Sequence, residues 1–211
     1  MPNSSFFNLS EERRNLVTFV AIEEFSTASY DTASINRICK KSSIAKGSFY
    51  QYFTDKLDLY VYIMTLAIEA KIAFFSASLN QFKTLPLMEQ IDLLFTKGIE
   101  FAKAYPQYAG LAEQFSKENN ETAKRAVIKE GDRQSESLFI QMIDHAKSKG
   151  EVDTSIDSFA LSMMLQSLNK TVNEYMLNKD ISYKNFDEEV RQFVNSLLDI
   201  LFNGIRNRSI M

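Results

Sequence analysis

The stretch INRICKKSSIAKGSFYQYF, residues 35–53, decides how this 211-residue chain folds. Its first part repeats isoleucine and cysteine at helical spacing, which predicts a short helix over about residues 34–41. Its last part places Phe49 and Phe53 four residues apart, which predicts a second short helix over residues 46–52. Because a turn of only three or four residues joins the two helices, the pair has the pattern of a helix-turn-helix.

The outward side of the second predicted helix is polar. Phe49 and Phe53 form its inward side and hold it on the first helix, so the rest of its surface is left free to enter a major groove. Gly47 removes a side chain at a point where the backbone could approach DNA closely. The outward residues are Lys46, Gly47, Ser48 and Gln51, flanked by Tyr50 and Tyr52.

Positive charge is concentrated in the same region. From Ile35 to Lys56 five basic residues stand against one acidic residue, a net charge of +4, whereas the whole chain carries −3, so the remainder carries −7. A small basic segment on an otherwise acidic protein is typical of a local phosphate-binding surface. A chance cluster on a solvated face is the alternative, and Lys40 and Lys41 fit that alternative better than a DNA contact.

The composition predicts an all-helical fold. The chain has 6 glycines and 3 prolines, fewer than the tight turns of β-sandwiches and barrels require. Helical periodicity can be followed almost throughout, with three short helices followed by six longer ones, about nine in total. We therefore expect a three-helix head over residues 1–54 and a helical bundle body over residues 55–211.

Other classes of protein are disfavoured. The longest stretch without a charged residue, 158–169, is much shorter than the about 20 apolar residues of a membrane helix, and the N-terminus lacks the pattern of a signal peptide. The single cysteine, Cys39, forms no internal disulfide and no Cys-Cys zinc pair, so we expect a cytoplasmic protein without metal or cofactor. Nucleophile and nucleotide-binding motifs are absent, and carboxylate pairs such as Glu23-Glu24 are predicted on solvated helix faces, so we expect no enzyme.

Residues 17–60 resemble the N-terminal domain of TetR-family transcriptional regulators. The most specific part of the resemblance is the run Lys46-Gly47-Ser48-Phe49-Tyr50-x-Tyr52-Phe53-x-x-Lys56. The other matching residues are Val17, Ala21, Phe25, Tyr30, Ser34, Ile35, Ile38, Ile44 and Leu59.

The sequence departs from the family at turn and cap positions. Ser29 and Ser43 stand where glycine is frequent, and serine in a left-handed turn costs about 1 kcal/mol relative to glycine. Ala45 stands where a serine or threonine often caps the recognition helix, and loss of such a cap costs about 1 kcal/mol.

The resemblance implies a role for each residue near the second helix of a DNA-binding head. The base-facing residues would be Lys46, Gly47, Ser48 and Gln51. The phosphate-holding residues would be Ser34, Tyr50, Tyr52 and Lys56. Ser34 would act through its hydroxyl and its backbone N–H. Packing against the body is the alternative for the two tyrosines.

The last two predicted helices carry apolar stripes at helical spacing. The resemblance implies that these helices of two subunits form a four-helix bundle, which sets two recognition helices about 34–36 Å apart on a palindromic operator. A monomer that buries the stripes internally is the alternative. The predicted interface residues are Leu161, Leu165, Leu168, Val172, Val190, Phe193, Val194, Leu197 and Leu201.

The body, which would bind a ligand and dimerise, is rich in aromatic and methionine side chains. These suit an adaptable pocket for lipophilic molecules, although core packing is their more frequent role. The candidate ligand-binding residues are Phe101, Tyr105, Tyr108, Phe115, Phe139, Met142, His145 and Asn169.

Together these features predict a repressor that binds a double-stranded DNA operator as a homodimer. A small, lipophilic effector would release it from the operator. The alternative is a helical protein- or ligand-binding module without sequence-specific DNA binding.

Overall fold

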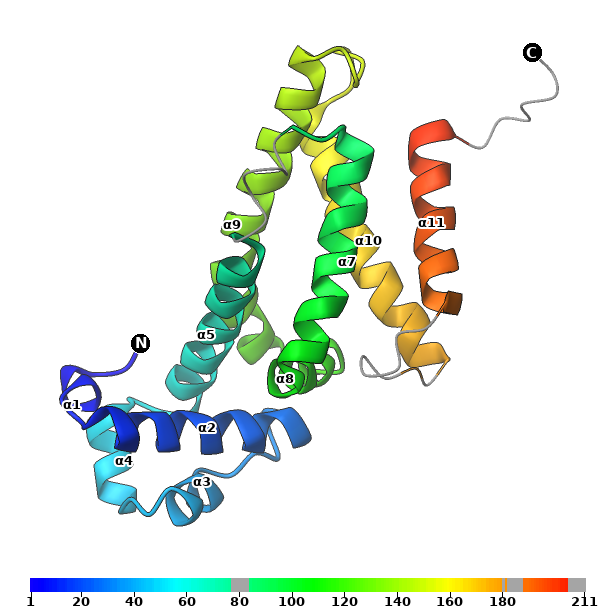
Figure 1. Cartoon of the computed structure of the whole chain (residues 1–211). Coiled ribbons are helices and arrows are strands. Elements are labelled where there is room, and N and C mark those ends of the chain that lie inside the picture. The colour runs from blue at the N-terminus through cyan, green and yellow to red at the C-terminus, as the bar shows by residue number, and fades with distance from the viewer. Residues whose placement is uncertain (77–83, 180, 182–187, 205–211) are drawn as a thin grey trace. The chain divides into compact units, whose positions relative to one another are not determined.

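Every regular element described in the computed structural model is a helix, which confirms the all-α prediction (Figure 1). The structure describes residues 1–76, 84–179, 181 and 188–204, without the side chains of residues 129–137, 169, 173 and 177. In this described part, no helix combines the length and the apolar character needed to cross a bilayer. The chain divides into two compact units: unit 1 comprises Met1–Phe74 and Ala102–Arg133, and unit 2 comprises Phe75–Phe101 and Gln134–Met211.

Unit 1 contains the predicted helix-turn-helix. Its elements are α1 (Ser4–Phe7), α2 (Glu11–Thr27), α3 (Ile35–Lys41), α4 (Lys46–Tyr52), α5 (Lys56–Ser76, as far as Phe74), α8 (Pro106–Ser116) and the first part of α9 (Glu121–Ser148). Helices α3 and α4 agree with the predicted ranges to within one residue. The division into domains at residue 54 stays a prediction.

Helix α2 forms because it has both a start signal and a continuous apolar face. The Ser10 hydroxyl accepts a hydrogen bond from the Arg13 N–H at 3.4 Å and caps the first turn. Its apolar face is buried and consists of Val17, Val20, Ala21 and Phe25. Helix α8 crosses α2 closely at Gly110, where an added Cβ would lie 3.0 Å from the Ser26 Cβ.

Helix α5 begins at a paired cap. The Asp55 carboxylate accepts from the Asp58 N–H at 2.8 Å, and the Asp58 carboxylate accepts from the Thr54 N–H at 3.0 Å. This reciprocal pattern satisfies two backbone donors where the helix cannot do so itself. Beyond the cap, Leu59 and Ile63 are fully buried and join α5 to the apolar core of unit 1.

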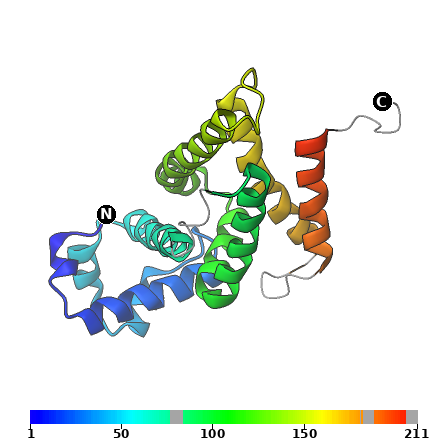
Figure 2. The ribbon, with the colours of Figure 1, turned by 45° about the horizontal axis from the view of Figure 1, so that its top comes forward.

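Unit 2 is a set of helices around a second apolar core. Its elements are most of α7 (Leu87–Ala104), the second part of α9, α10 (Ser158–Asn178) and α11 (Glu188–Asn203). Figure 2 shows α11 beside α10, as Figure 1 does. Between these two helices the rings of Tyr175 and Phe193 stack with their centroids 3.9 Å apart. The sequence also predicts body helices that end at about Asn80 and Ile205, and both of these residues lie outside the described ranges.

Candidate DNA-binding interface

Helix α4 presents a polar surface because its two apolar anchors are buried. Phe49 and Phe53 are fully buried, with ring centroids 5.5 Å apart. The predicted base-facing residues are the exposed Lys46, Gly47 and Gln51 and the half-buried Ser48. They therefore lie on one short helix, and none of them belongs to the core.

Gly47 has no steric reason within the protein to be glycine. A Cβ built on it would meet no heavy atom within 4 Å, and its φ is not in the left-handed region. Glycine inside a helix costs about 1 kcal/mol relative to alanine. An unhindered glycine on the exposed side of α4 therefore favours the close approach of an external partner to the backbone.

A Schellman motif closes the turn between α3 and α4, with serine at its left-handed position. Ser43 has a φ of 55°, the one positive value at a non-glycine residue in the described ranges. The Ile44 N–H donates to the Cys39 carbonyl at 3.0 Å, and the Ser43 N–H donates to the Lys40 carbonyl at 3.4 Å. Serine thus holds here the backbone conformation that usually favours glycine.

A buried carboxylate on α2 holds the start of α3. Glu24 is 5% exposed, and its Oε1 accepts from the Ser34 N–H at 2.8 Å and from Arg37 Nε at 2.9 Å. Burial raises the pKa of Glu24, but the hydrogen bonds from Arg37 and Ser34 and the nearby positive charges outweigh it and hold this pKa below its ordinary value.

The prediction of a solvated face for Glu23-Glu24 is wrong for Glu24. Glu23 is exposed, whereas Glu24 lies three, four and seven residues after buried apolar residues of α2 and therefore shares their face. That spacing is the signal in the sequence that could have identified Glu24 as a structural partner of Arg37.

These contacts use part of the hydrogen-bonding capacity of Ser34. Its backbone N–H, one of the two groups predicted to hold a phosphate, is taken by Glu24 at 2.8 Å. Its hydroxyl oxygen accepts from the Arg37 N–H at 3.3 Å and caps α3. The hydroxyl still carries its own proton, so it remains the group at this position that can donate to a phosphate.

Lys56, another predicted phosphate-holding residue, has partners within unit 1. Its Nζ donates to the carbonyl oxygens of Asp31 and Ala33, each at 3.2 Å. It also lies 4.6 Å from the centroid of the Tyr30 ring, within the range of a cation–π contact. To contact a phosphate, the Lys56 ammonium group must therefore either bind it in addition to these two carbonyls or release one of them.

The two tyrosines of α4 differ in their surroundings. Tyr50 is exposed and makes an edge contact with Phe49, their centroids being 5.2 Å apart. Tyr52 is half-buried, and its ring centroid lies 6.0 Å from that of Phe6 on α1. Tyr50 thus extends into solvent, whereas part of the Tyr52 ring packs inside unit 1.

Known proteins share this sequence and this arrangement. Residues 19–63 match the family described as bacterial regulatory proteins, tetR family. Over 198 residues the chain is 24% identical to an HTH-type transcriptional regulator of Staphylococcus aureus (strain MRSA252), covering 93% of this chain and 96% of that protein. The crystal structure of a TetR family transcriptional regulator from Chloroflexus aurantiacus J-10-FL matches this chain with a TM-score of 0.64. The two sequences are 29% identical, and the match covers 99% of this chain and 100% of that chain. Together these likenesses support a TetR-family transcriptional regulator.

The regulator FadR from Bacillus subtilis, solved in complex with stearoyl-CoA, has the same fold. It is 17% identical with a TM-score of 0.72, and the likeness covers 91% of this chain and 99% of that chain. The protein described here is thus a DNA-binding helix-turn-helix regulator of transcription, and its relatives are regulators rather than enzymes.

The candidate ligand-binding residues are divided between the two units. Those in unit 1 are Tyr105, Tyr108 and Phe115. Those in unit 2 are the buried Phe101, Phe139 and Met142 and the exposed His145. The Asn169 side chain lies outside the described residues. Phe139 and Met142 pack in the apolar core of unit 2, so core packing accounts for both of them.

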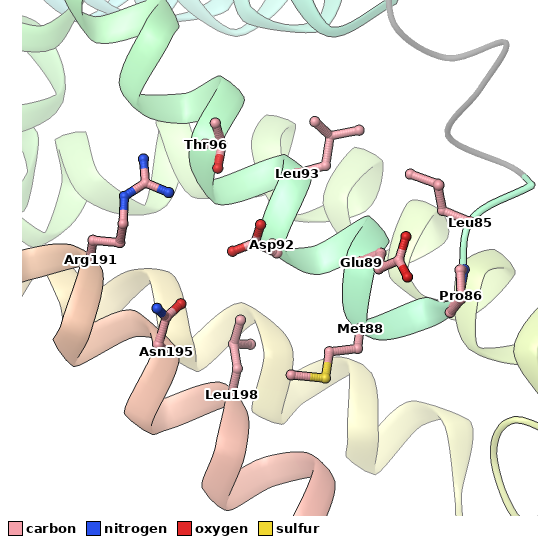
Figure 3. Close-up of a pocket in the computed structure, with 10 residues that line it drawn as sticks. All are labelled: Leu85, Pro86, Met88, Glu89, Asp92, Leu93, Thr96, Arg191, Asn195 and Leu198. Atoms are coloured by element: carbon pink, nitrogen blue, oxygen red, sulfur yellow. The ribbon is translucent and has the colours of Figure 1, made fainter.

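A groove in unit 2 lies between α7 and α11 (Figure 3). Its volume is about 790 Å³. The lining residues are Leu85, Pro86, Met88, Glu89, Asp92, Leu93, Thr96, Arg191, Asn195 and Leu198. None of the eight candidate ligand-binding residues is among them, so the groove is a separate feature of unit 2.

The apolar stripes predicted as a dimer interface pack within one chain. The buried members are Leu165, Val172, Val190 and Val194. The members that are half-buried against the same core are Leu161, Leu168, Phe193, Leu197 and Leu201. All nine side chains thus lie in or against the apolar core of unit 2, and their contact with a second subunit stays a prediction. The large apolar residues left exposed on the two helices are Phe159, Met163, Met164 and Ile200.

Proposed function

We propose that this TetR-family protein is a cytoplasmic repressor that binds a palindromic operator as a homodimer and is released by a small, lipophilic effector. The polar, solvent-facing side of α4 carries the proposal, because Phe49 and Phe53 anchor the helix from within and leave that side free. A narrow helix with a polar outer side suits the major groove, which is about 12 Å wide.

The chemistry of the exposed residues supports a division between base and phosphate contacts. Lys46 can donate to guanine edges, Gln51 can form a paired contact with adenine, and Gly47 allows the backbone to come near. Tyr50 and the Ser34 hydroxyl end in donors that suit phosphate oxygens. Base contacts then select the sequence, whereas phosphate contacts position the protein on it.

Exposed apolar residues on α10 support the homodimer. Phe159, Met163 and Met164 are 54%, 52% and 56% exposed within six residues of one helix. A cluster of this kind marks a protein interaction surface more often than an ordinary face, and a second copy of the chain is the partner that a palindrome requires. Such a dimer would carry two recognition helices about 34–36 Å apart.

A lipophilic effector is supported by the relatives and by the body of this chain. FadR from Bacillus subtilis, which shares the fold, was solved with stearoyl-CoA. The groove between α7 and α11 combines apolar side chains such as Met88 and Leu198 with the charged Asp92 and Arg191 (Figure 3), which suits an amphipathic molecule. The effector would lower operator affinity by as much as it prefers the DNA-free conformation.

Selection from a pool of random duplexes tests the DNA part of this proposal. We expect enrichment of a palindrome whose half-sites lie about one helical turn or a multiple of it apart. If nothing is enriched at low salt, the repressor proposal fails and a protein- or ligand-binding helical module takes its place. Sedimentation of the free protein and of its operator complex tests the homodimer independently.

Paired variants separate the two kinds of contact. Lys46→Ala and Gln51→Ala should change which sequence is enriched. Tyr50→Ala should weaken binding to all sequences alike, and because the tyrosine hydroxyl is neutral it should leave the salt slope unchanged. Lys40→Ala, which removes an exposed charge of α3, is the matched control and should leave the enriched sequence unchanged.

A further inference from the structure

A short N-terminal segment, Asn3–Phe6, lies against the C-terminal end of the recognition helix α4. The Asn3 backbone N–H donates to the Tyr52 carbonyl at 2.8 Å, and the Asn3 side-chain Nδ2 donates to the Gln51 carbonyl at 3.1 Å. The Ser5 hydroxyl donates to the same Gln51 carbonyl. Three donors from this segment thus meet two adjacent carbonyls of α4.

Those carbonyls are ones that α4 cannot satisfy itself. The last four carbonyls of a helix lack partners within it. Phe53 is extended, with φ −130° and ψ 138°, and its N–H reaches only back to the Phe49 carbonyl at 2.9 Å. The next N–H, that of Thr54, is bound to Asp58 at 3.0 Å. The chain that follows α4 therefore turns away from Gln51 and Tyr52.

The length of α4 makes these external bonds important. It has seven residues, and isolated helices shorter than about 12–15 residues are marginal in water. It also begins without a side-chain cap at Ala45. With an uncapped start and a glycine at its second position, α4 depends on contacts from other parts of unit 1 to keep its shape.

Phe6 fastens the segment in place. It is fully buried, with its ring centroid 4.9 Å from that of Phe53 and 5.5 Å from that of Tyr62 on α5. Because Phe53 is also the inward anchor of α4, the segment and the recognition helix share one aromatic cluster. The buried Phe6 side chain therefore keeps Asn3 and Ser5 in place for their hydrogen bonds.

We infer that Asn3 and Ser5 are positioning residues for DNA recognition, holding the backbone at Gln51 so that its side chain keeps one direction toward the bases. The inference rests on the proposed base-reading role of Gln51. The two residues act through Gln51 rather than on DNA, so their loss should reduce sequence selectivity more than general DNA affinity.

The first test needs no DNA and uses the full chain. In Asn3→Ala/Ser5→Ala, amide hydrogen exchange across residues 49–53 should become about tenfold faster, whereas exchange in α2 stays as in the wild type. Ser4→Ala is the matched control, because Ser4 is the exposed neighbour on the same short helix and its side chain has no recorded hydrogen bond among the described residues. Unchanged exchange over residues 49–53 in the double variant would overturn the inference.

The second test measures selectivity. Affinity for the duplex selected by the wild type is compared with affinity for a scrambled duplex of the same length. The ratio of the two affinities should fall about tenfold in Asn3→Ala/Ser5→Ala, while the salt slope stays unchanged. The variant Asn3→Ala/Ser5→Thr keeps a hydroxyl at position 5 and should therefore retain part of the wild-type ratio. A merely structural role would lower the melting temperature and leave this ratio as it is.

The two proposals fail in different ways. If the wild type enriches a palindrome and the double variant keeps the full ratio, the positioning role of Asn3 and Ser5 is wrong and the repressor proposal stands. If the wild type enriches no sequence, the repressor proposal is wrong, and the positioning of a base-reading helix is wrong with it.

Discussion

The helix-turn-helix in unit 1 and the α10–α11 pair in unit 2 both have apolar cores, but they differ in the polar contacts that accompany those cores. Around α3 the decisive contacts are directional, as in the bonds that Glu24 accepts from Ser34 and Arg37. Between α10 and α11 a hydrogen bond, from the Tyr175 hydroxyl to Glu189 at 2.7 Å, accompanies an apolar core that includes Leu165 and Val194. Hydrogen bonds to a buried charge fix one geometry, whereas the hydrophobic effect has no direction. Helix α3 is thus held on α2 with a defined geometry in addition to its apolar contacts.

Glu118 extends the directional contacts within unit 1. It is buried, and its carboxylate accepts from the Tyr30 N–H at 2.7 Å and from the Asn120 N–H at 2.8 Å. The Asn120 side chain in turn donates to Asp31 at 2.7 Å and caps α9 through the Ala123 N–H at 3.0 Å. The loop before α3 is therefore joined to the start of α9 by polar groups with defined geometry.

The largest effect should come from a cavity in the apolar part. Leu165→Ala removes a side chain that is 2% exposed, and it should cost about 2–5 kcal/mol of unfolding free energy. Leu138→Ala makes the same change at a leucine of α9 that is 40% exposed, and it should cost about 1 kcal/mol or less. Urea unfolding measures both. Equal costs would mean that Leu165 is not part of a close-packed core.

A smaller loss should follow in the directional part. Glu24→Ala leaves the Ser34 N–H and Arg37 Nε without their acceptor, whereas Arg37 Nη2 keeps the Thr32 carbonyl, and the loss should be about 2–3 kcal/mol. Glu23→Ala, at the exposed neighbour, is the control and should change stability by about 0.5 kcal/mol or less. If both variants unfold at the same urea concentration, directional bonding is not what secures α3.

Acid should weaken the Glu24 contact specifically. Because the folded-state pKa of Glu24 is lowered, the stability from its ionised form is complete above about pH 4.3, the usual glutamate pKa, and is lost as the pH falls through the lower folded value. The stability gap between the wild type and Glu24→Gln should therefore shrink as the pH falls from about 5 to 3. Urea unfolding at several pH values measures this gap, and a gap that stays constant over the range would show that Glu24 does not titrate with folding.

For the helix-turn-helix and its surroundings, the sequence predicted the two main helices but not the hydrogen bonds that hold them. The boundaries of α4 follow from Phe49 and Phe53, whose spacing permits one inward face. Helix α1 was missed, because four residues are too few to show a period. The bonds from Asn3 to Gln51 join residues far apart in the chain, and no local pattern announces them.

In the apolar region the sequence predicted which residues pack but not which helix they pack against. The stripe through Val190 and Val194 identified a packing helix correctly, and both residues are buried. The same spacing fits a partner helix in the same chain or in a second subunit, because apolar contact specifies no partner. The exposed Met163 was left out of the predicted interface, since a stripe drawn for one face ignores what the other face presents.

The smallest changes in stability should have a similar size in the two units, because they arise in the backbone. Helices α3 and α9 both end in a Schellman motif, with Ser43 at φ 55° in one and Gly150 at φ 76° in the other. Ser43→Gly relieves left-handed strain but frees the unfolded chain, so it should gain about 0.5–1 kcal/mol. Gly150→Ala introduces the strain that Ser43 carries, and since a Cβ there meets no atom within 4 Å, it should lose about 1 kcal/mol for that reason alone. Thermal unfolding measures the pair. A loss in Ser43→Gly would mean that the serine hydroxyl contributes more than its backbone costs, and the turn would then belong with the side-chain contacts that secure α3.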